Sequence, residues 1–415
     1  MGFSSSSWSW AGLGCGLLAL AVLFPPDPGL RFKPPPFKAS TESDGYTVWR
    51  RTSDGDAYGR RTVYVESGGE MLHCWLYLPA SSIAKAPIYV VAHGFGAVKA
   101  VADVRFAEKI QEGGMAVITF DYRTWGYSGG APRHIVDPDM QLEDFRAVLK
   151  HIVDTDGFQG LVDPLDIHIF GTSYAGGHVL VLASQLAQER DSPLFRSLRT
   201  VSSVVPLIDG KAQMKKALQQ RSFFRTLRYV AAILADLLRQ AAGGQLQPIY
   251  VQIAGSRGAT SLSAMELQGD ELKIWSARST VEIETGTWSN ELAARSLFNT
   301  SRYRPINHLA HIRTPTLLVE AEFDDTCIPK LTADALEAIN SRGRAASSKR
   351  PSSDAPQEAG SLAQLYRMPI NHFDVYLSPH LENLIGTSMT FAKRHSVHHR
   401  GSTTGESVGR GSAAA

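Results

Sequence analysis

One stretch of seven residues holds a serine in a setting suited to nucleophilic catalysis. Residues 171–177 read GTSYAGG, between a short apolar run and an apolar run with helical spacing. A serine on a sharp strand-to-helix turn has its hydroxyl lifted above the sheet, and the turn requires small residues two positions before and after it. Gly171 and Ala175 meet that requirement. We therefore predict that Ser173 is a nucleophile.

The serine needs a base, and the base needs a carboxylate that orients it. On a turn of this kind the three residues follow the chain order serine, acid, histidine. The apolar run 317–320 leads into two adjacent candidates for the acid, Asp324 and Asp325. We favour Asp324 because it lies the expected number of residues after the predicted strand. Asp325 instead lies the expected number of residues before the proline that follows. His372, in the loop after the last predicted strand, is then the base.

Acyl transfer also needs N–H donors for the negative oxygen that develops in the transition state. The sequence His93-Gly94-Phe95-Gly96 directly follows a predicted strand. Such a tight turn can aim the backbone N–H of Phe95 at this oxygen, and the N–H of Tyr174 in the first turn of a helix is the second candidate. We expect the His93 side chain only to brace the turn.

The remaining histidines and the cysteines do not form a competing site. His134, His151 and His168 precede the serine, and His380 and His395 fall on the final predicted helix. The cysteines are Cys15, Cys74 and Cys327, too few for a disulfide framework, and no pair has metal-ligand spacing. The chemistry expected of Ser173 needs no metal or organic cofactor.

Strands and helices alternate along most of the chain. The expected strands are 62–65, 72–78, 87–92, 115–122, 167–170, 201–207, 315–320 and 362–368, and the expected helices are 101–111, one that starts after Asp137, 174–189, 223–238, 329–339 and one near the end. Alternation of this kind predicts an α/β fold with a doubly wound, mostly parallel sheet. The core would comprise residues 45–207 and 313–395. The alternation lapses at 208–312, where we expect an inserted, largely helical lid.

The predicted lid contains an apolar stripe with helical spacing, flanked by arginines. Its members are Phe223, Phe224, Leu227, Leu234, Leu237 and Leu238, with Arg221, Arg225, Arg228 and Arg239 around them. The favoured interpretation is a helix packed on the core. The alternatives are the lining of an acyl-chain cleft or a helix at a membrane surface. We also expect the lid to form an apolar substrate cleft, because charged groups that could fix a substrate are few there.

The two ends and one internal segment differ from the core. Residues 1–28 contain an uncharged apolar run at 8–24, which suggests a membrane anchor or secretory signal, with a cytoplasmic protein as the alternative. The start also matches the short N-myristoylation pattern. Residues 341–360 and 396–415 are rich in Ser, Gly and charge, so we expect both to be disordered. The 42 basic and 40 acidic residues leave a net charge of +2, which gives no footprint for nucleic acid.

Further motifs carry a family resemblance from about residue 62 to 395. They are Phe120-Asp121-Tyr122-Arg123 with Trp125-Gly126-Tyr127-Ser128-Gly129, Trp288-Ser289-Asn290 with Tyr303-Arg304-Pro305, and His372-Phe373-Asp374-Val375-Tyr376. With the serine turn they resemble α/β-hydrolases of the dienelactone-hydrolase-like and Xaa-Pro dipeptidyl-peptidase-like branch, and are similar to fungal polyketide transferases. Dienelactone hydrolases have cysteine, and haloalkane dehalogenases aspartate, where this chain has Ser173.

The resemblance and the motifs together imply a serine hydrolase that cleaves an ester or thioester of a small-molecule acyl substrate. An acyltransferase would use the same three residues. A peptidase is a third possibility, supported by fold analogy only. A non-catalytic binding protein on the same scaffold would usually lack part of the catalytic set, which is complete here.

Overall fold

The computed structural model describes residues 47–49, 60–80, 85–243, 246–275, 288–346 and 361–397. The predicted N-terminal anchor at 1–28 lies outside these residues. So do residues 347–360 of the predicted internal insertion and residues 398–415 of the predicted tail. None of the helices within the described ranges is both long enough and apolar enough to cross a membrane.

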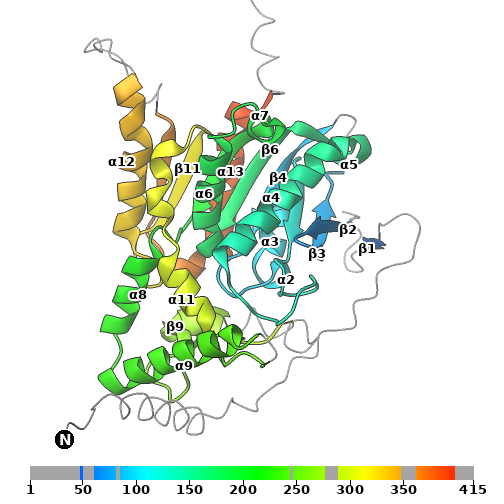
Figure 1. Ribbon diagram of the computed structural model, residues 1–415. Coiled ribbons are helices and arrows are strands. Elements are labelled where there is room, and N and C mark those ends of the chain that lie inside the picture. The colour runs from blue at the N-terminus through cyan, green and yellow to red at the C-terminus, as the bar shows by residue number, and fades with distance from the viewer. Residues whose placement is uncertain are drawn as a thin grey trace, which may run out of the picture.

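A nine-stranded sheet forms the centre of the described residues (Figure 1). In spatial order its strands are β1 (Thr47–Trp49), β2 (Arg60–Ser67), β3 (Glu70–Tyr77), β5 (Ala116–Phe120), β4 (Ala86–Ala92), β6 (Val162–Thr172), β7 (Leu198–Val204), β11 (Thr316–Ala321) and β12 (Ala363–Met368). The strands from β1 to β5 pair antiparallel, and those from β5 to β12 pair parallel. This confirms the predicted α/β fold.

Burial explains why the inner strands read as continuous apolar runs. Every residue of β5 and of β11 is buried, because helices cover both faces of a parallel sheet. The hairpin β2–β3 is antiparallel, with Ser67 opposite Glu70 at its turn. The sequence patterns that predicted these strands therefore reflect the place of each strand in the sheet.

Helices flank both faces of the sheet. The helices are α2 (Lys99–Ala102), α3 (Val104–Glu112), α4 (Pro138–Asp154), α5 (Asp156–Gly160), α6 (Tyr174–Leu186), α7 (Pro193–Ser197), α12 (Pro329–Ala346) and α13 (His380–His395). Helix α3 packs with α13, and α4 packs with α6 and α7. In Figure 1, α4 and α6 lie in front of the sheet and α13 behind it. Helix α4 starts after Asp137 as predicted, and the Asp137 side chain caps it by accepting from the N–H groups of Asp139 and Met140.

The chain between β7 and β11 gathers at one end of the sheet, where Figure 1 shows α8, α9, β9 and α11. It contains α8 (Gly210–Gln219), α9 (Phe223–Ala241), α11 (Arg295–Arg302), the 3₁₀ turns η1 (Pro305–Asn307) and η2 (Leu309–His311), and a small sheet of β10 (Glu291–Ala293), β8 (Tyr250–Ser256) and β9 (Ser263–Leu267). The small sheet was not predicted. Its strands are short, and β10 pairs with β8 from some 40 positions along the chain, so no local pattern marks it.

The favoured interpretation of the apolar stripe is wrong. On α9 the side chains of Phe223, Phe224, Leu227, Leu234 and Leu238 are exposed. Instead, the face around Tyr229 and Asp236 is buried. Amphipathic spacing predicts that a helix has two faces, but it does not say which face packs on the protein.

Two segments predicted to be disordered begin with ordered residues. Helix α12 extends to Ala346, six residues into the predicted insertion at 341–360. At the other end, Ser396 Oγ donates a hydrogen bond to Asp166 Oδ2, and the backbone N–H of Val397 donates to the same oxygen over 3.0 Å. The first two residues of the predicted tail are therefore hydrogen-bonded to β6.

Candidate active site

Ser173 sits on a strained turn between β6 and α6. Its backbone angles are φ 56° and ψ −113°, which lie outside the regions that L-residues ordinarily occupy. A Cβ on Gly171 would lie 2.1 Å from the carbonyl oxygen of Ala175, so the turn accepts only glycine there. The Ser173 N–H donates to the Val204 carbonyl over 2.8 Å, which ties the turn to the end of β7. Strain of this kind persists only where surrounding structure fixes it, and it is common at functional sites.

The structure brings Ser173, His372 and Asp324 into one hydrogen-bonded line. His372 Nε2 lies 3.1 Å from Ser173 Oγ, and His372 Nδ1 lies 2.7 Å from Asp324 Oδ2. Both His372 and Asp324 are buried. Water is thus largely kept from the carboxylate–imidazole contact, where a low dielectric strengthens a charge-assisted hydrogen bond.

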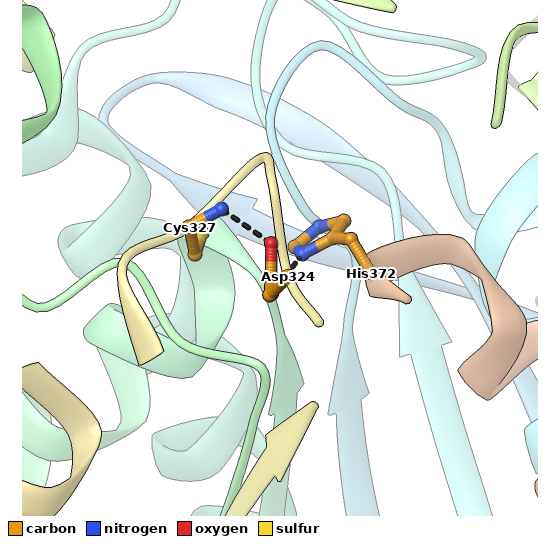
Figure 2. A group of neighbouring side chains, drawn as sticks. All are labelled: Asp324, Cys327 and His372. Atoms are coloured by element: carbon orange, nitrogen blue, oxygen red, sulfur yellow. Dashed lines mark hydrogen bonds and ion pairs between the residues drawn. The ribbon is translucent and has the colours of Figure 1, made fainter. Parts of the chain in front are cut away.

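The turn after β11 fixes the carboxylate. Asp324 Oδ1 accepts from the N–H groups of Thr326, over 2.8 Å, and Cys327, over 2.6 Å, which leaves Oδ2 to face His372 (Figure 2). The alternative candidate, Asp325, is exposed, and the carboxylate that bonds to His372 is that of Asp324. Both residues lie in the turn beyond β11, where the N–H groups of Thr326 and Cys327 fix only the Asp324 side chain.

The acid turn and the histidine loop are also bonded to each other. The Glu322 N–H donates to the Met368 carbonyl over 2.8 Å, and the Phe323 N–H donates to the Ile370 carbonyl over 3.1 Å. These bonds continue the parallel pairing of β11 and β12 beyond the strands. The two loops that carry Asp324 and His372 therefore hold a common register.

The turn after β4 lies against the serine. A Cβ on Gly94 would lie 2.9 Å from Ser173 Cβ, so the backbone that leads into Phe95 passes directly beside the serine. Tyr174 is the first residue of α6, and the first N–H groups of a helix have no acceptor within it. Both predicted donors thus belong to backbone that adjoins Ser173. The His93 side chain is buried, and its Nδ1 lies 3.1 Å from the Gly94 carbonyl, as expected of a residue that braces the turn.

Two contacts that sequence reasoning missed hold this turn. Trp288 Nε1 donates to the Gly96 carbonyl over 2.7 Å. Lys99, at the start of α2, forms a fully buried ion pair with Asp121, and the Lys99 N–H donates to the other oxygen of that carboxylate over 2.9 Å. Trp288 and Asp121 both lie in motifs that carry the family resemblance. Their partners are more than twenty residues away, so spacing alone could not reveal the contacts.

Cys327 is a further side chain beside the hydrogen-bonded line of Ser173, His372 and Asp324. With Asp324 and His372 it forms a buried group whose donor atoms all lie within 4.8 Å of one another (Figure 2). Burial raises the pKa of the Cys327 thiol well above its ordinary value, and the charge of Asp324 acts in the same direction. A metal ion here would have to displace a proton from this thiol and separate the hydrogen-bonded Asp324 and His372. The group therefore suits a hydrogen-bonded line of side chains better than a metal centre.

Two pockets meet at Ser173. The larger has a volume of about 120 Å³ and lies under the chain between β7 and β11, with Met214, Tyr229 and Leu267 among its lining residues. The smaller has a volume of about 30 Å³ and is lined largely by apolar and aromatic side chains, including Trp275 and Phe373. Ser173 and Phe95 line both pockets, whereas His372 lines only the smaller one.

The larger pocket is not the apolar cleft that we expected. Its lining includes Gln213, Arg221, Arg257, Glu266 and Glu271 beside its apolar residues. The exposed stripe on α9 contributes nothing to it, because that helix turns its other face, around Tyr229, inward. Glu271 Oε1 is buried and finds no hydrogen-bond partner among the residues that the structure describes, and burial raises the pKa of its carboxyl. The pocket thus combines apolar walls with a few polar groups, as ligand sites commonly do.

The chain is similar in sequence to a known protein family and to several known proteins. The family model described as "Serine aminopeptidase, S33" matches residues 84–348. The quorum-quenching protein AidA of Acinetobacter baumannii (strain MDR-ZJ06) is 26% identical over 333 residues, which are 80% of this chain and 94% of that protein. The thiohydrolase aneE of Aspergillus aculeatus (strain ATCC 16872 / CBS 172.66 / WB 5094) is 26% identical over 265 residues, 62% of this chain and 75% of that protein.

Solved structures agree on the fold. The α/β hydrolase GrgF from Penicillium sp. sh18 superposes with a TM-score of 0.58 at 19% identity, over 81% of this chain and 99% of that one. DcsB, solved with a substrate analogue, gives a TM-score of 0.59 at 18% identity, over 81% and 99% of the two chains. At this identity the likeness concerns the fold alone. With a family model that matches most of the chain, it establishes that the protein belongs to the α/β-hydrolase family described as serine aminopeptidase, S33.

Proposed function

We propose that the protein is a serine hydrolase that cleaves an ester or thioester of a small-molecule acyl substrate. The observation that carries the proposal is the line from Asp324 through His372 to Ser173, with contacts of 2.7 and 3.1 Å, at the junction of two pockets. A nucleophile, a base and an orienting carboxylate in hydrogen-bond contact are what acyl transfer through a covalent intermediate requires.

In the proposed reaction, Ser173 Oγ attacks the acyl carbonyl while His372 Nε2 takes the hydroxyl proton. Asp324 keeps the imidazole oriented and stabilises the imidazolium that forms. The backbone N–H groups of Phe95 and Tyr174 stabilise the oxyanion. His372 then returns the proton to the leaving oxygen or sulfur, and a water molecule activated by the same imidazole hydrolyses the acyl-enzyme.

The two pockets suggest how the substrate is oriented. Because His372 must protonate the leaving atom, the leaving group lies on the side of Ser173 that His372 faces. That side is the smaller pocket, so we assign the leaving group to it and the acyl group to the larger pocket. A volume of about 30 Å³ accommodates a small alcohol or thiol portion and disfavours a branched one.

The names of several relatives support acyl chemistry without separating hydrolysis from transfer. Beside the thiohydrolase, an acyltransferase drtE of Aspergillus calidoustus is 23% identical over 60% of this chain and 73% of that protein. Transfer would replace the attacking water by an alcohol and would use the same residues. The family description also names an aminopeptidase, so an amide substrate belongs in any test.

The experiment compares ester, thioester and aminoacyl-anilide substrates with one acyl group, in wild-type protein and in Ser173→Ala. Ser341→Ala, at an exposed serine, is the matched control. We expect the wild-type protein to turn over the ester or the thioester substrate. Ser173→Ala should lose this activity, and the control should retain it. An added alcohol that diverts the acyl group into a new ester would assign the protein to transfer. Activity that survives in Ser173→Ala would refute the proposal.

A further inference from the structure

We propose that helices α8 and α9 form a face that docks on an anionic lipid surface, with the exposed stripe of α9 entering the interface. The stripe is defined here as Phe223, Phe224, Leu227, Val230, Leu234 and Leu238. The inference concerns binding and goes beyond the proposed catalytic function.

The stripe concentrates exposed apolar surface on one helix. Its exposed fractions run from 39% for Val230 to 76% for Phe224. Among the described residues, twelve large hydrophobic side chains are exposed, and six of them belong to this stripe. Single exposed apolar residues are ordinary, but a contiguous patch of this kind marks an interaction site.

The opposite face of α9 is fastened to the protein, so the stripe cannot turn inward by rotation of the helix. Glu266 Oε1 accepts from Arg221 Nε over 2.8 Å and from Arg225 Nε over 2.7 Å. The buried carboxylate of Asp236 accepts from the N–H groups of Ile249, over 2.9 Å, and Arg295, over 2.8 Å. These contacts hold the face with Tyr229 and Asp236 inward, so the stripe on the other side faces outward.

Charge favours an anionic surface as the occupant. Residues 210–241 contain one acidic side chain, the buried Asp236, and seven basic ones. Arg221 and Arg225 pair with Glu266 on the inward face, and the other five are Lys211, Lys215, Lys216, Arg228 and Arg239. The whole chain has a net charge of only +2. Lys211 and Lys215 are exposed on α8. An apolar helical face with neighbouring cations is the pattern that binds the interfacial region of anionic membranes.

A second copy of the chain fits less well. In a symmetric dimer built on this face, two basic surfaces would oppose each other, and like charges across an interface disfavour association. The face also adjoins the larger pocket, since Gln213, Met214 and Ala217 of α8 line it. Docking would therefore bring the pocket close to lipid, where apolar acyl substrates are concentrated.

The test measures co-sedimentation of the full chain with phosphatidylcholine vesicles that contain 30% phosphatidylserine or none. The uncharged variant Phe224→Ser/Leu234→Ser removes part of the stripe, and Gln219→Ser/Gln240→Ser, at exposed polar positions, is its matched control. We expect at least tenfold weaker binding for the stripe variant and wild-type binding for the control. Lys211→Gln/Lys215→Gln should weaken binding only to the anionic vesicles, by about fivefold for each cation.

A local reporter separates this face from any other membrane contact of the chain. A photoreactive benzoylphenylalanine in place of Leu234 should crosslink to lipid, whereas the same group in place of Gln240 should not. Equal vesicle binding of the stripe variant and wild type, together with no lipid crosslink from position 234, would overturn the proposal. Crosslinks to a second copy, with a dimer in vesicle-free solution that the stripe variant abolishes, would overturn it in favour of self-association. Turnover of a soluble short ester is unaffected by the stripe variant in every case, so failure here is distinct from failure of the proposed activity.

Discussion

Lowering the pH from 7 to 5 should strongly reduce the stability of this protein, because several histidines are buried where they cannot take up a proton. Burial lowers the pKa of His73, His134 and His178 to about 3, and that of His93 to about 4. The unfolded chain binds these protons near pH 6.5. Stability is therefore fully present above pH 6.5 and is lost as the pH falls toward the folded-state values.

The size of the effect follows from linkage. Between pH 7 and pH 5 each of the four histidines costs about 2 kcal/mol of unfolding free energy. Asp144 acts in the opposite direction, because burial raises the pKa of its carboxyl to about 6. Protonation of that carboxyl returns about 1 kcal/mol over the same interval. The net loss is about 7 kcal/mol, comparable to the whole stability of many proteins.

Urea unfolding followed by tryptophan fluorescence at pH 7.5, 6.5, 5.5 and 5.0 measures this loss. The variant His178→Gln should reduce the pH slope by about one proton, or about 1.4 kcal/mol per pH unit. Its control is Tyr303→Phe, which removes the 2.8 Å contact to His178 Nδ1 but keeps the imidazole. The control should lower stability at every pH without changing the slope. A stability that is flat or rises between pH 7 and 5 would refute the reasoning.

Three further predictions concern side chains near the site. Asp324→Asn should lower turnover by about 10⁴-fold, while Asp325→Asn should have a mild effect because that side chain is exposed. Steady-state kinetics with one ester substrate measure both effects. The reverse result would assign the orienting role to Asp325. Cys327 should resist iodoacetamide at pH 8 in the folded protein, because burial raises the pKa of its thiol, and should react in urea; rapid alkylation of the native protein, seen by peptide mass, would contradict the burial. Asp121→Asn should lower the unfolding free energy by about 3–5 kcal/mol, because it leaves Lys99 charged and buried; a loss below about 1 kcal/mol in urea unfolding would show that Lys99 finds another partner.

The features that sequence predicted well are those with a local cause. The serine turn needs small residues at fixed positions, and a Cβ at Gly171 would indeed collide with the backbone of Ala175. The Asp137 cap and the buried apolar strands are likewise set by a few neighbouring residues. The relation of Asp324 to His372 was accessible because the carboxyl ends of parallel strands meet at one edge of a sheet.

The features that sequence did not reveal depend on distant partners. The stripe on α9 has regular spacing, but whether it faces protein or solvent is decided by the bonds of the opposite face to Glu266, Ile249 and Arg295, which lie far along the chain. The polar lining of the larger pocket comes from several separate elements, so counting apolar residues in one segment misjudged it. The bond from Trp288 to the Gly96 carbonyl joins residues 192 positions apart.

The proposed function depends above all on Ser173 being a nucleophile that His372 activates. Its most direct measurement is covalent labelling by a fluorophosphonate, followed by intact-mass and peptide analysis of wild type, Ser173→Ala and His372→Ala. We expect one adduct in wild type, located on Ser173, none in Ser173→Ala and a much slower reaction in His372→Ala. An adduct on another serine, or labelling of Ser173→Ala at the wild-type rate, would contradict it.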